Sequence, residues 1–380
     1  MGRAWSRRTF VSQLGTMAAI GGLLPVRNSL AWANGGANAG AQAGIAALKD
    51  AAASRGILYG AGETQKHLMA DPKLMRAFVA QCAILVPEWE LKWDYLRPTP
   101  DTYNFAPADW LLNFTQQNNM KMRGHTLVWY QALPKWFDAY INAGNAQQMM
   151  LSHISTVVGR YAGKLHSWDV VNEAIDPADR RPDNLRNNSW LKFVGPDYIE
   201  TAFRAAAQAD PSAMLVWNEN WMEEETSYGD KKRAAWLQHL GDFLKRNVPI
   251  HAIGIQSHLV GDHNNLAGPH FQKFLRDASA LGLKILITEM DVQDNNLPAD
   301  VSTRDGIIGN LYYQYLSTVL NEKAVIAVLT WGLSDAYSWM VGFKPRTDGN
   351  PVRPLPLDTN MAPTPAYQAM VRAFNSAPAR

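Results

Sequence analysis

The sequence predicts an α/β fold, a single-domain (β/α)8 barrel. Eight short runs rich in apolar and β-branched residues recur along the chain, and segments with helical periodicity separate them. The runs cover residues 57–60, 83–86, 120–127, 165–171, 214–217, 252–256, 283–288 and 325–330. This regular alternation favours one closed barrel. A doubly wound open sheet is the main alternative, although the chain has no Gly-rich phosphate loop.

Local signals mark several of the intervening helices. Asp71 followed by Pro72 is typical of an N-cap and a first-turn proline, and the pair predicts a helix through residue 81. Asp210 and Pro211 end another helix, which begins near Pro196. Apolar periodicity predicts the remaining helices over residues 147–161, 231–246, 271–281 and 304–320.

The first residues resemble an export signal. Arg7 and Arg8 precede a mildly apolar run over residues 11–24, and Ala31-Trp32-Ala33 has the small-x-small form of a signal-peptidase site. We therefore expect a twin-arginine signal peptide over residues 1–33, a flexible leader over 34–44 and the (β/α)8 barrel over 45–380. The apolar run is too short to span a membrane. The expected location is periplasmic or secreted, and an ordinary basic N-terminus is the alternative.

Composition narrows the class of partner. Removal of the signal would take away four arginines and no acid, so the formal charge would change from +2 to −2. Such a chain is not expected to bind nucleic acid or an anionic membrane. Cys82 is the only cysteine, so stability must come from the core and not from an intramolecular disulfide. The 14 Trp and 13 Tyr are typical of a large core or of a cleft lined for sugar rings.

Polar side chains follow the C-terminal ends of the predicted strands, where a (β/α)8 barrel keeps its chemistry, so in such a barrel we expect all of them to meet at one mouth. Asn172 and Glu173 follow the fourth strand, and Glu289 follows the seventh. Other polar or aromatic residues near strand ends are Glu63, Glu88, His125, Trp129, Glu219, Gln256, His258, Asp291, Trp331 and Asp335. Any one of them could be a salt bridge at the barrel rim or a buried core residue. Together, acids, amides, histidines and tryptophans are what a sugar site requires, with two carboxylates for the bond chemistry.

Five motifs resemble those of glycoside hydrolase family ten, the retaining endo-β-1,4-xylanases. They are G-H-T-L-V-W (124–129), W-D-V-V-N-E-A (168–174), G-I-Q-S-H (254–258), I-T-E-M-D (287–291) and T-W-G-L-S-D (330–335). The resemblance covers essentially the whole chain after the signal. It implies a TIM barrel whose substrate is a polysaccharide or oligosaccharide, xylan by default. It implies no cofactor and no metal, and we expect a monomer.

The resemblance assigns the catalytic roles. Glu173 would be the acid/base at the end of the fourth strand, and Glu289 the nucleophile at the end of the seventh. In a retaining mechanism one carboxyl attacks the anomeric carbon while the other protonates the leaving oxygen and then activates water. By the same resemblance, His258 with Asp291 behind it would hydrogen-bond Glu289 and keep it ionised.

The resemblance also assigns substrate-binding residues. They are Glu88, Lys92, His125, Trp129, Asn172, Gln256, His258, Trp331 and Trp339. Asn172 would hydrogen-bond the sugar 2-OH, a contact that strengthens as oxocarbenium character develops. His125 and Gln256 would hold the sugar at the cleavage position, with Trp331 and Trp339 as its walls. Glu88 and Lys92 would bind the next sugar on the non-reducing side.

The departures from the family pattern lie beside this centre. The family pattern E-N-x-M-K-W is E-W-E-L-K-W at residues 88–93, so Trp89 stands where the family has a sugar-binding Asn. After G-H-T-L-V-W the family continues H-x-Q, whereas this chain has Tyr130, Gln131 and Ala132. The family pattern Y-N-D-Y-N is W-N-E-N-W at residues 217–221. The flanking subsites are therefore expected to differ from those of the family.

Three alternatives remain beside the xylanase interpretation. The same mechanism could act on another or a heavily substituted β-linked glycan, because the flanking residues differ. A non-catalytic glycan-binding barrel is disfavoured because both carboxylates are retained. A metal-dependent hydrolase is also disfavoured, because only His125 and His258 fall at strand ends and no H-x-H or H-E-x-x-H spacing is present.

Overall fold

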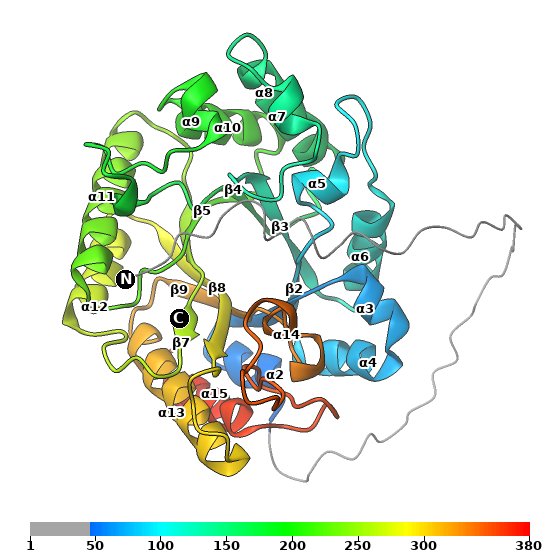
Figure 1. The fold of residues 1–380 in the computed structure, drawn as a ribbon, viewed down its shortest axis with the longest axis vertical. Helices are drawn as coiled ribbons and strands as arrows, with labels where there is room; N and C mark the ends of the chain where they lie inside the picture. Colours follow the sequence, from blue (N-terminus) through cyan, green and yellow to red (C-terminus); the bar gives the residue numbers. More distant parts are fainter. Residues whose placement is uncertain (1–45) are drawn as a thin grey trace, which may run out of the picture. The chain divides into compact units, whose positions relative to one another are not determined.

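Eight parallel strands close into a barrel, as expected (Figure 1). The structure is a computed structural model that describes residues 46–380; the predicted signal peptide and the whole of the predicted leader lie outside these residues. The ring consists of β1 (Leu58–Glu63), β2 (Ile84–Pro87), β3 (Lys121–Val128), β4 (Ser167–Asn172), β5 (Met214–Glu219), β6 (Ala252–Ile255), β8 (Lys284–Gln293) and β9 (Val325–Thr330). Pairing of β9 with β1 closes it, which excludes the open sheet.

The sixth strand of the barrel is broken in two. β6 pairs with the first half of β8, and β7 (His258–Val260) pairs with its last residues, beginning at Asp291. Gln256 and Ser257 form the break, and Ser257 has a left-handed backbone with φ 63°. Because β7 extends the pairing, β8 continues past Glu289 to Gln293. Glu289 therefore lies within its strand. The sequence analysis had placed it at the strand's end, and that prediction was wrong.

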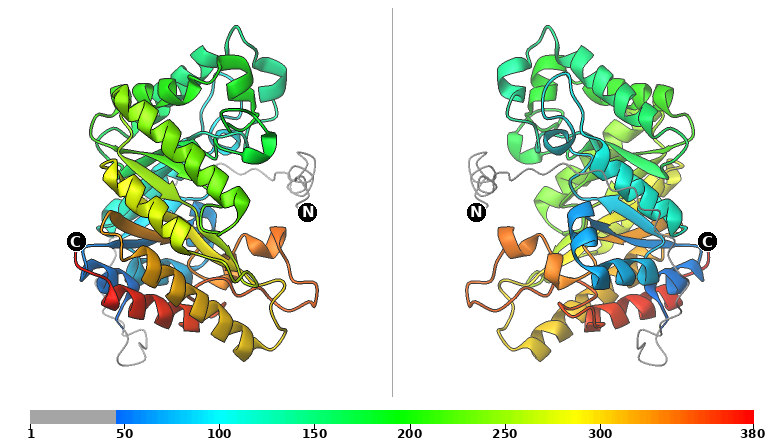
Figure 2. Two further views of the ribbon diagram at one scale, coloured as in Figure 1. Left: turned by 90° about the vertical axis from the view of Figure 1, so that its left-hand side faces the viewer. Right: turned by 90° about the vertical axis from the view of Figure 1, so that its right-hand side faces the viewer.

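Helices cover the outside of the barrel, as the side views in Figure 2 show. The longer ones are α4 (Pro72–Gln81), α6 (Ala106–Gln117), α8 (Ala146–Arg160), α10 (Tyr198–Ala209), α11 (Ser227–Lys245), α12 (Pro269–Ala280), α13 (Val301–Val319) and α15 (Pro365–Ser376). Shorter ones are α2 (Leu48–Ala53), α3 (Gln65–Ala70), α5 (Trp93–Leu96), α7 (Phe137–Tyr140), α9 (Ser189–Val194), α14 (Met340–Phe343) and the 3₁₀ turns η1 (Pro177–Asp179) and η2 (Asp335–Tyr337). All six predicted helices are present. Asp71 caps α4 as expected, because its side chain accepts a hydrogen bond from the Lys73 amide.

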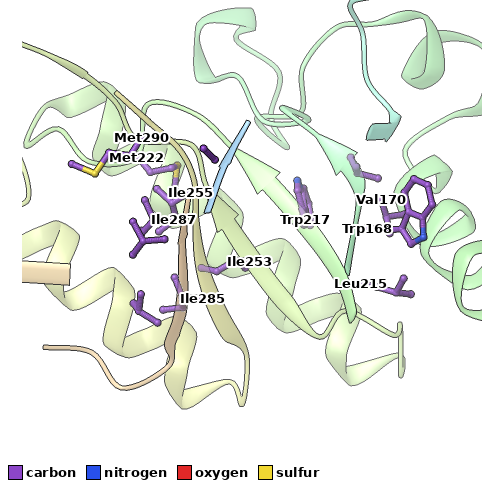
Figure 3. Close-up of a cluster of buried hydrophobic side chains, with 14 of the residues drawn as sticks. Trp168, Val170, Leu215, Trp217, Met222, Ile253, Ile255, Ile285, Ile287 and Met290 are labelled. Atoms are coloured by element: carbon purple, nitrogen blue, oxygen red, sulfur yellow. The ribbon is translucent and has the colours of Figure 1, made fainter. Parts of the chain in front are cut away.

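Apolar side chains fill two layers. A small cluster inside the barrel consists of Ile84, Val86, Val216, Ala252, Leu286, Ala327, Leu329 and Trp331. A much larger layer lies between the strands and the helices, and Figure 3 shows part of it, including Trp168, Leu215 and Trp217. Side chains alternate between these layers along a strand, so Val216 faces the barrel interior while its neighbours Leu215 and Trp217 face the helices. Cys82 is buried in the outer layer.

The two ends of the barrel differ. The segment that contains α14 lies on the opposite side of the barrel from the C-terminus in Figure 2, beyond the C-terminal ends of the strands. Trp339, next to α14, reaches back to the end of β8, where its indole nitrogen donates to Asp291. Polar side chains gather at this end of the barrel, above the inner apolar cluster. Among residues 46–380, no helix is both long and apolar enough to cross a membrane.

Candidate active site at the C-terminal mouth of the barrel

Glu173 follows β4 directly and is nearly buried, with 6% of its surface exposed. Its backbone is left-handed, with φ 55°. Its side-chain Oε1 accepts a hydrogen bond from Gln256 Nε2 at 2.9 Å and a longer one from Asn172 Nδ2 at 3.4 Å. Both donors are neutral amides, which stabilise a carboxylate less than a cation would. A carboxyl group held in this way can take up and release a proton.

Glu289 is bound differently. Asn218 Nδ2 donates to its Oε1 at 2.8 Å, and His258 Nε2 lies 3.2 Å from its Oε2. Burial alone would raise the pKa of Glu289, but the His258 hydrogen bond and the nearby side chains of His125 and Lys92 outweigh burial and lower this pKa to about 2. Glu289 is therefore an ionised carboxylate at neutral pH, which suits a nucleophile.

His258 is held between two carboxylates. Its Nδ1 lies 2.9 Å from Asp291 Oδ1, while its Nε2 meets Glu289. Burial opposes the charged ring, yet the two carboxylates raise the pKa of His258 well above its usual value. Trp339 Nε1 donates to the other oxygen of Asp291 at 2.7 Å and so fixes that carboxylate. The expected contact between His258 and Glu289 is present, with Asp291 behind it.

A second buried histidine is oriented from the neighbouring strand. His125 Nδ1 lies 2.9 Å from Asp169 Oδ2, and the other oxygen of Asp169 pairs with Arg123. The Nδ1–H of His125 therefore points to Asp169, and its Nε2 is left for a ligand. The sequence analysis missed Asp169. The sequence did contain a signal for Asp169, because an acid in the middle of an apolar strand needs a buried partner.

Asn218 is the other residue that the sequence analysis missed. Its amide nitrogen donates both to Glu289 and to Asn172 Oδ1, the latter at 2.9 Å. Thr288 fixes the amide orientation by donating to Asn218 Oδ1 at 2.7 Å. Gln256 donates to Glu173 and, at 3.3 Å, to Asn172 Oδ1. The two carboxylic acids are thus joined through amides on three different strand ends.

Three strand-end acids do not face this centre. Glu219 forms a fully buried ion pair of 2.9 Å with Lys232 of α11, on the outside of the barrel. Glu63 accepts from His67 of α3, and Asp335 accepts from the Leu355 amide. The expectation that every strand-end acid meets at one mouth was therefore wrong. For Glu219 the reason is strand alternation, because Val216 and Asn218 face inward and Glu219 follows them by one residue.

Aromatic rings and one cation line the side of β2. Lys92 Nζ lies 4.4 Å from the ring centroid of Trp89, 5.2 Å from that of Trp129 and 5.6 Å from that of Trp331. Trp331 also stands beside both histidines, with its ring centroid 5.4 Å from that of His125 and 6.4 Å from that of His258. Lys92 is thus enclosed by three indole faces, an arrangement that favours a cation.

Glu88 lies in the same wall and is buried. Burial, reinforced by the nearby Glu63 carboxylate, raises the pKa of Glu88 well above its usual range. Burial also lowers the pKa of the Lys92 ammonium. A protonated Glu88 can donate a hydrogen bond as well as accept one, which suits the recognition of a sugar hydroxyl. Gly62 leaves room for this side chain, because a Cβ there would lie only 3.3 Å from Glu88 Cγ.

The chemistry available here is that of carboxylic acids. A histidine and an amide hydrogen-bond the carboxylate of Glu289, and two neutral amides hydrogen-bond that of Glu173. In the part of the chain that the structure describes, no group of three or more His, Cys, Asp or Glu could hold a metal ion. A (β/α)8 barrel with two such carboxylic acids in an aromatic-walled mouth defines a glycoside hydrolase.

The chain belongs to glycosyl hydrolase family 10, because the model of that family matches residues 47–373. Endo-1,4-beta-xylanase 3 of Hypocrea jecorina is 33% identical over 317 residues, which cover 83% of this chain and 82% of that protein. Endo-1,4-beta-xylanase B of Thermotoga neapolitana is 32% identical over 83% of this chain and 87% of its own length. The predictions of family and fold are confirmed.

Solved structures agree with this assignment. Native xylanase 10B from Thermotoga maritima matches with a TM-score of 0.78 and 32% identity, and the match covers 86% of this chain and 98% of that one. Xylanase 10B from Thermotoga petrophila RKU-1, solved in complex with xylobiose, matches with the same TM-score of 0.78 and 31% identity over 88% of this chain and 98% of its own.

Proposed function

We propose that this protein is an endo-1,4-β-xylanase that cleaves xylan by double displacement with retention of configuration. The observation that carries the proposal is the contrast between the two carboxylic acids. The His258 hydrogen bond and nearby positive charges outweigh burial and lower the pKa of Glu289 to about 2, whereas the carboxyl group of Glu173 accepts hydrogen bonds from the neutral amides of Gln256 and Asn172. The relatives named above are xylanases, and one of them was solved with xylobiose.

In the first step, a carboxylate oxygen of Glu289 attacks the anomeric carbon. The bond to the leaving oxygen breaks as Glu173 donates its proton to that oxygen, and a covalent glycosyl-enzyme forms. In the second step, Glu173 takes a proton from water, the water oxygen attacks the anomeric carbon, and Glu289 is released as a carboxylate. Glu173 ends protonated, so both residues return to their starting states.

The residues around this pair bind the sugar in the proposed mechanism. Asn172 is fixed by Asn218, which also donates to Glu289, so its position beside Glu173 suits a hydrogen bond to the sugar 2-OH. His125 presents Nε2 to the same space, and Trp331 stands against both histidines as the wall. Glu88 and Lys92 serve the next sugar on the non-reducing side.

Another or a substituted β-linked glycan is the second candidate substrate, and one observation favours it. Trp89, in place of the family's Asn, lies over the Lys92 ammonium at 4.4 Å. An indole face stacks on a sugar ring but is less selective for its hydroxyls than an amide is. A non-catalytic glycan-binding barrel has no such support, because both carboxylic acids are in place.

The test is to incubate the enzyme with linear xylan, substituted xylans, mixed-linkage β-glucan and their oligosaccharides, and to size the products by chromatography. Short xylo-oligomers released from the interior of linear xylan are the expected result. Release of only one small product from chain ends would contradict the endo mode of action. Cleavage of glucan but not xylan would contradict the substrate, and Glu173→Gln serves as the inactive control.

We also propose export by the twin-arginine route to the periplasm or beyond, supported by Arg7, Arg8 and the Ala31-Trp32-Ala33 site. Replacement of both arginines by Lys keeps the charge and should trap the precursor in the cytoplasm. Immunoblots of cytoplasmic, periplasmic and culture fractions measure this. Unimpaired export of the double Lys variant would contradict the route.

A further inference from the structure

The backbone of the proposed acid/base is held in a conformation that few residues other than glycine adopt. Glu173 has φ 55°. Its amide donates to Asn218 O at 2.9 Å, and its carbonyl accepts from Arg186 Nε at 2.8 Å. These two contacts fix both peptide groups that flank the Glu173 side chain. The direction of its carboxyl group therefore depends on where Arg186 holds the carbonyl.

Arg186 is itself locked in place by the loop after β4. This loop folds back on itself through a bridge between Ile175 and Leu185, and the Arg186 amide donates to Ala174 O at 2.7 Å. The Nη1 of Arg186 lies 2.8 Å from Asp176 Oδ2. The side chain is only 13% exposed, which strengthens this ion pair relative to one at the surface.

An aromatic face supports the same guanidinium group. The Cζ of Arg186 lies 4.3 Å from the ring centroid of Tyr130, which is the residue that replaces the family's His after G-H-T-L-V-W. A planar guanidinium at this distance stacks favourably on an aromatic ring. Asp176 is also fixed, because Tyr228 donates its hydroxyl proton to Asp176 Oδ1 at 3.1 Å. The loops after β3 and β4 and the first turn of α11 thus all contribute to the position of Arg186.

We propose that Arg186 is a positioning residue that aims the carboxyl group of Glu173 at the leaving oxygen, and that Tyr130 supports it by stacking. The proposal rests on the proposed function, because it takes Glu173 to be the acid/base. The proposal also gives a role to Tyr130, which stands where the family has His: its ring helps to hold the acid/base in place. Arg186 acts through the main chain of Glu173 and through Asp176, and its positive charge also interacts with the Glu173 carboxyl group. It needs no contact with the sugar.

A positioning role has a specific kinetic signature. Proton donation matters for a leaving group of high pKa and hardly at all for an activated one. Loss of Arg186 should therefore slow the first step only for poor leaving groups. The second step always needs Glu173 as a base, so it should slow for every substrate, and the glycosyl-enzyme should accumulate. General damage to the sugar subsites would instead lower the rates for all leaving groups alike.

The experiment compares phenyl β-xylobioside with 2,4-dinitrophenyl β-xylobioside in the native enzyme and in Arg186→Met. We expect kcat/KM for the phenyl substrate to fall by about 10- to 100-fold, because the variant loses part of the rate enhancement that a general acid provides. For the dinitrophenyl substrate, kcat/KM should fall by less than about threefold. For the dinitrophenyl substrate, kcat and KM should fall together, and azide should raise kcat because it attacks the glycosyl-enzyme without a base.

Three matched variants act as controls. Arg181→Met removes another arginine of the same loop, one whose side chain pairs with Asp183 and does not contact Glu173, so both substrates should react as in the native enzyme. Tyr130→Phe keeps the ring and should keep activity, whereas Tyr130→Ala should show the Arg186→Met pattern in weaker form. Where Arg186→Met does not fold, as judged by its melting curve, Arg186→Lys gives the same comparison with a smaller loss.

The outcomes separate the two proposals. An equal fall of kcat/KM on both xylobiosides in the Arg186 variants, with no effect of azide, would overturn the positioning role alone. Failure of the native enzyme to hydrolyse either xylobioside would overturn the proposed function instead. A fall confined to the phenyl substrate, together with azide rescue on the activated one, supports the positioning role.

Discussion

Asn218 donates a hydrogen bond of 2.8 Å to Oε1 of Glu289, 71 residues further along the chain. It leaves Oε2 to His258, so each oxygen of this carboxylate has its own donor. Thr288 holds the Asn218 amide in the orientation that presents NH₂ to Glu289. This arrangement stabilises the ionised state of Glu289 and fixes the plane of its carboxylate.

Asn218→Ala should therefore reduce catalysis strongly without unfolding the barrel. A hydrogen bond to a charged group contributes about 1.5–3 kcal/mol, so kcat/KM on xylo-oligosaccharides should fall by roughly 10- to 150-fold. Asn218→Asp should lose more, because a second carboxylate beside Glu289 raises the pKa of the nucleophile. Steady-state kinetics and melting curves measure the two effects. Activity of Asn218→Asp equal to that of Asn218→Ala would argue against this account.

The pH dependence of the reaction should report on His258. The nucleophile acts as a carboxylate, and its pKa of about 2 places the acidic limb of kcat/KM at low pH. His258→Gln keeps a hydrogen-bond donor but removes the positive charge, so the pKa of Glu289 should rise toward its ordinary value of 4.5. The acidic limb should move to higher pH by the same amount, and the loss of activity should be largest in acid. An unshifted limb would contradict the role of His258.

Glu289→Ala deletes the nucleophile, so both steps of the reaction should fail. With an activated aryl xylobioside and azide, the cavity left by the side chain admits the anion, which attacks the anomeric carbon directly. The expected product is the α-xylobiosyl azide, of inverted configuration. Product analysis by NMR provides the measurement. Normal turnover of Glu289→Ala would show that another group is the nucleophile.

Glu173→Ala should behave differently on the same substrates. It should lose almost all activity on xylan but keep appreciable attack on aryl glycosides with good leaving groups, because these need no protonation. Azide should rescue the second step and give the β-xylobiosyl azide, since attack on the glycosyl-enzyme restores the original configuration. Equal loss on activated and natural substrates would contradict the assignment of Glu173.

Trp89 and Ala132 should change the specificity of the subsite on the non-reducing side. Each stands where a polar residue is expected from the family, and loss of a polar contact costs about 0.5–1.5 kcal/mol, or roughly two- to tenfold. Trp89 lies over Lys92 and can offset part of this by stacking, with less selectivity for hydroxyls. The ratio of kcat/KM on linear xylo-oligosaccharides to that on substituted ones should therefore be lower in the native enzyme than in the double variant Trp89→Asn with Ala132→Gln.

The measurement is kcat/KM on linear and substituted xylo-oligosaccharides of equal length in both enzymes. The cleavage position keeps Asn172, His125 and Trp331, so the requirement for an equatorial 2-OH should be unchanged in the double variant. This requirement acts as the internal control. The hypothesis fails if the native enzyme strongly prefers linear substrates and the double variant gains nothing on them.

The strands and most of the longer helices could be predicted from the sequence because their signals are local. Apolar runs and caps such as Asp71 with Pro72 depend on neighbouring residues, and the structure places these elements within a few residues of the expected positions. α6 and α15 were not assigned. The buried face of α15 combines Ala366, Ala369 and Ala373 with Tyr367, Met370 and Phe374 at helical spacing, so a local signal for this helix was present in the sequence.

The sequence by itself determined the barrel and the family, and its motifs identified Glu173 and Glu289 as the candidate carboxylic acids, because apolar runs and short motifs are local signals. The tertiary structure alone decided how each acid is held. Glu219 is an ion-pair partner of Lys232 because the pleat turns it outward, while Asn218 faces inward and reaches Glu289. The left-handed backbone of Glu173 and its contact with Arg186 depend on a loop that folds back. Such contacts join distant residues, and their energies appear only when burial removes the competing water.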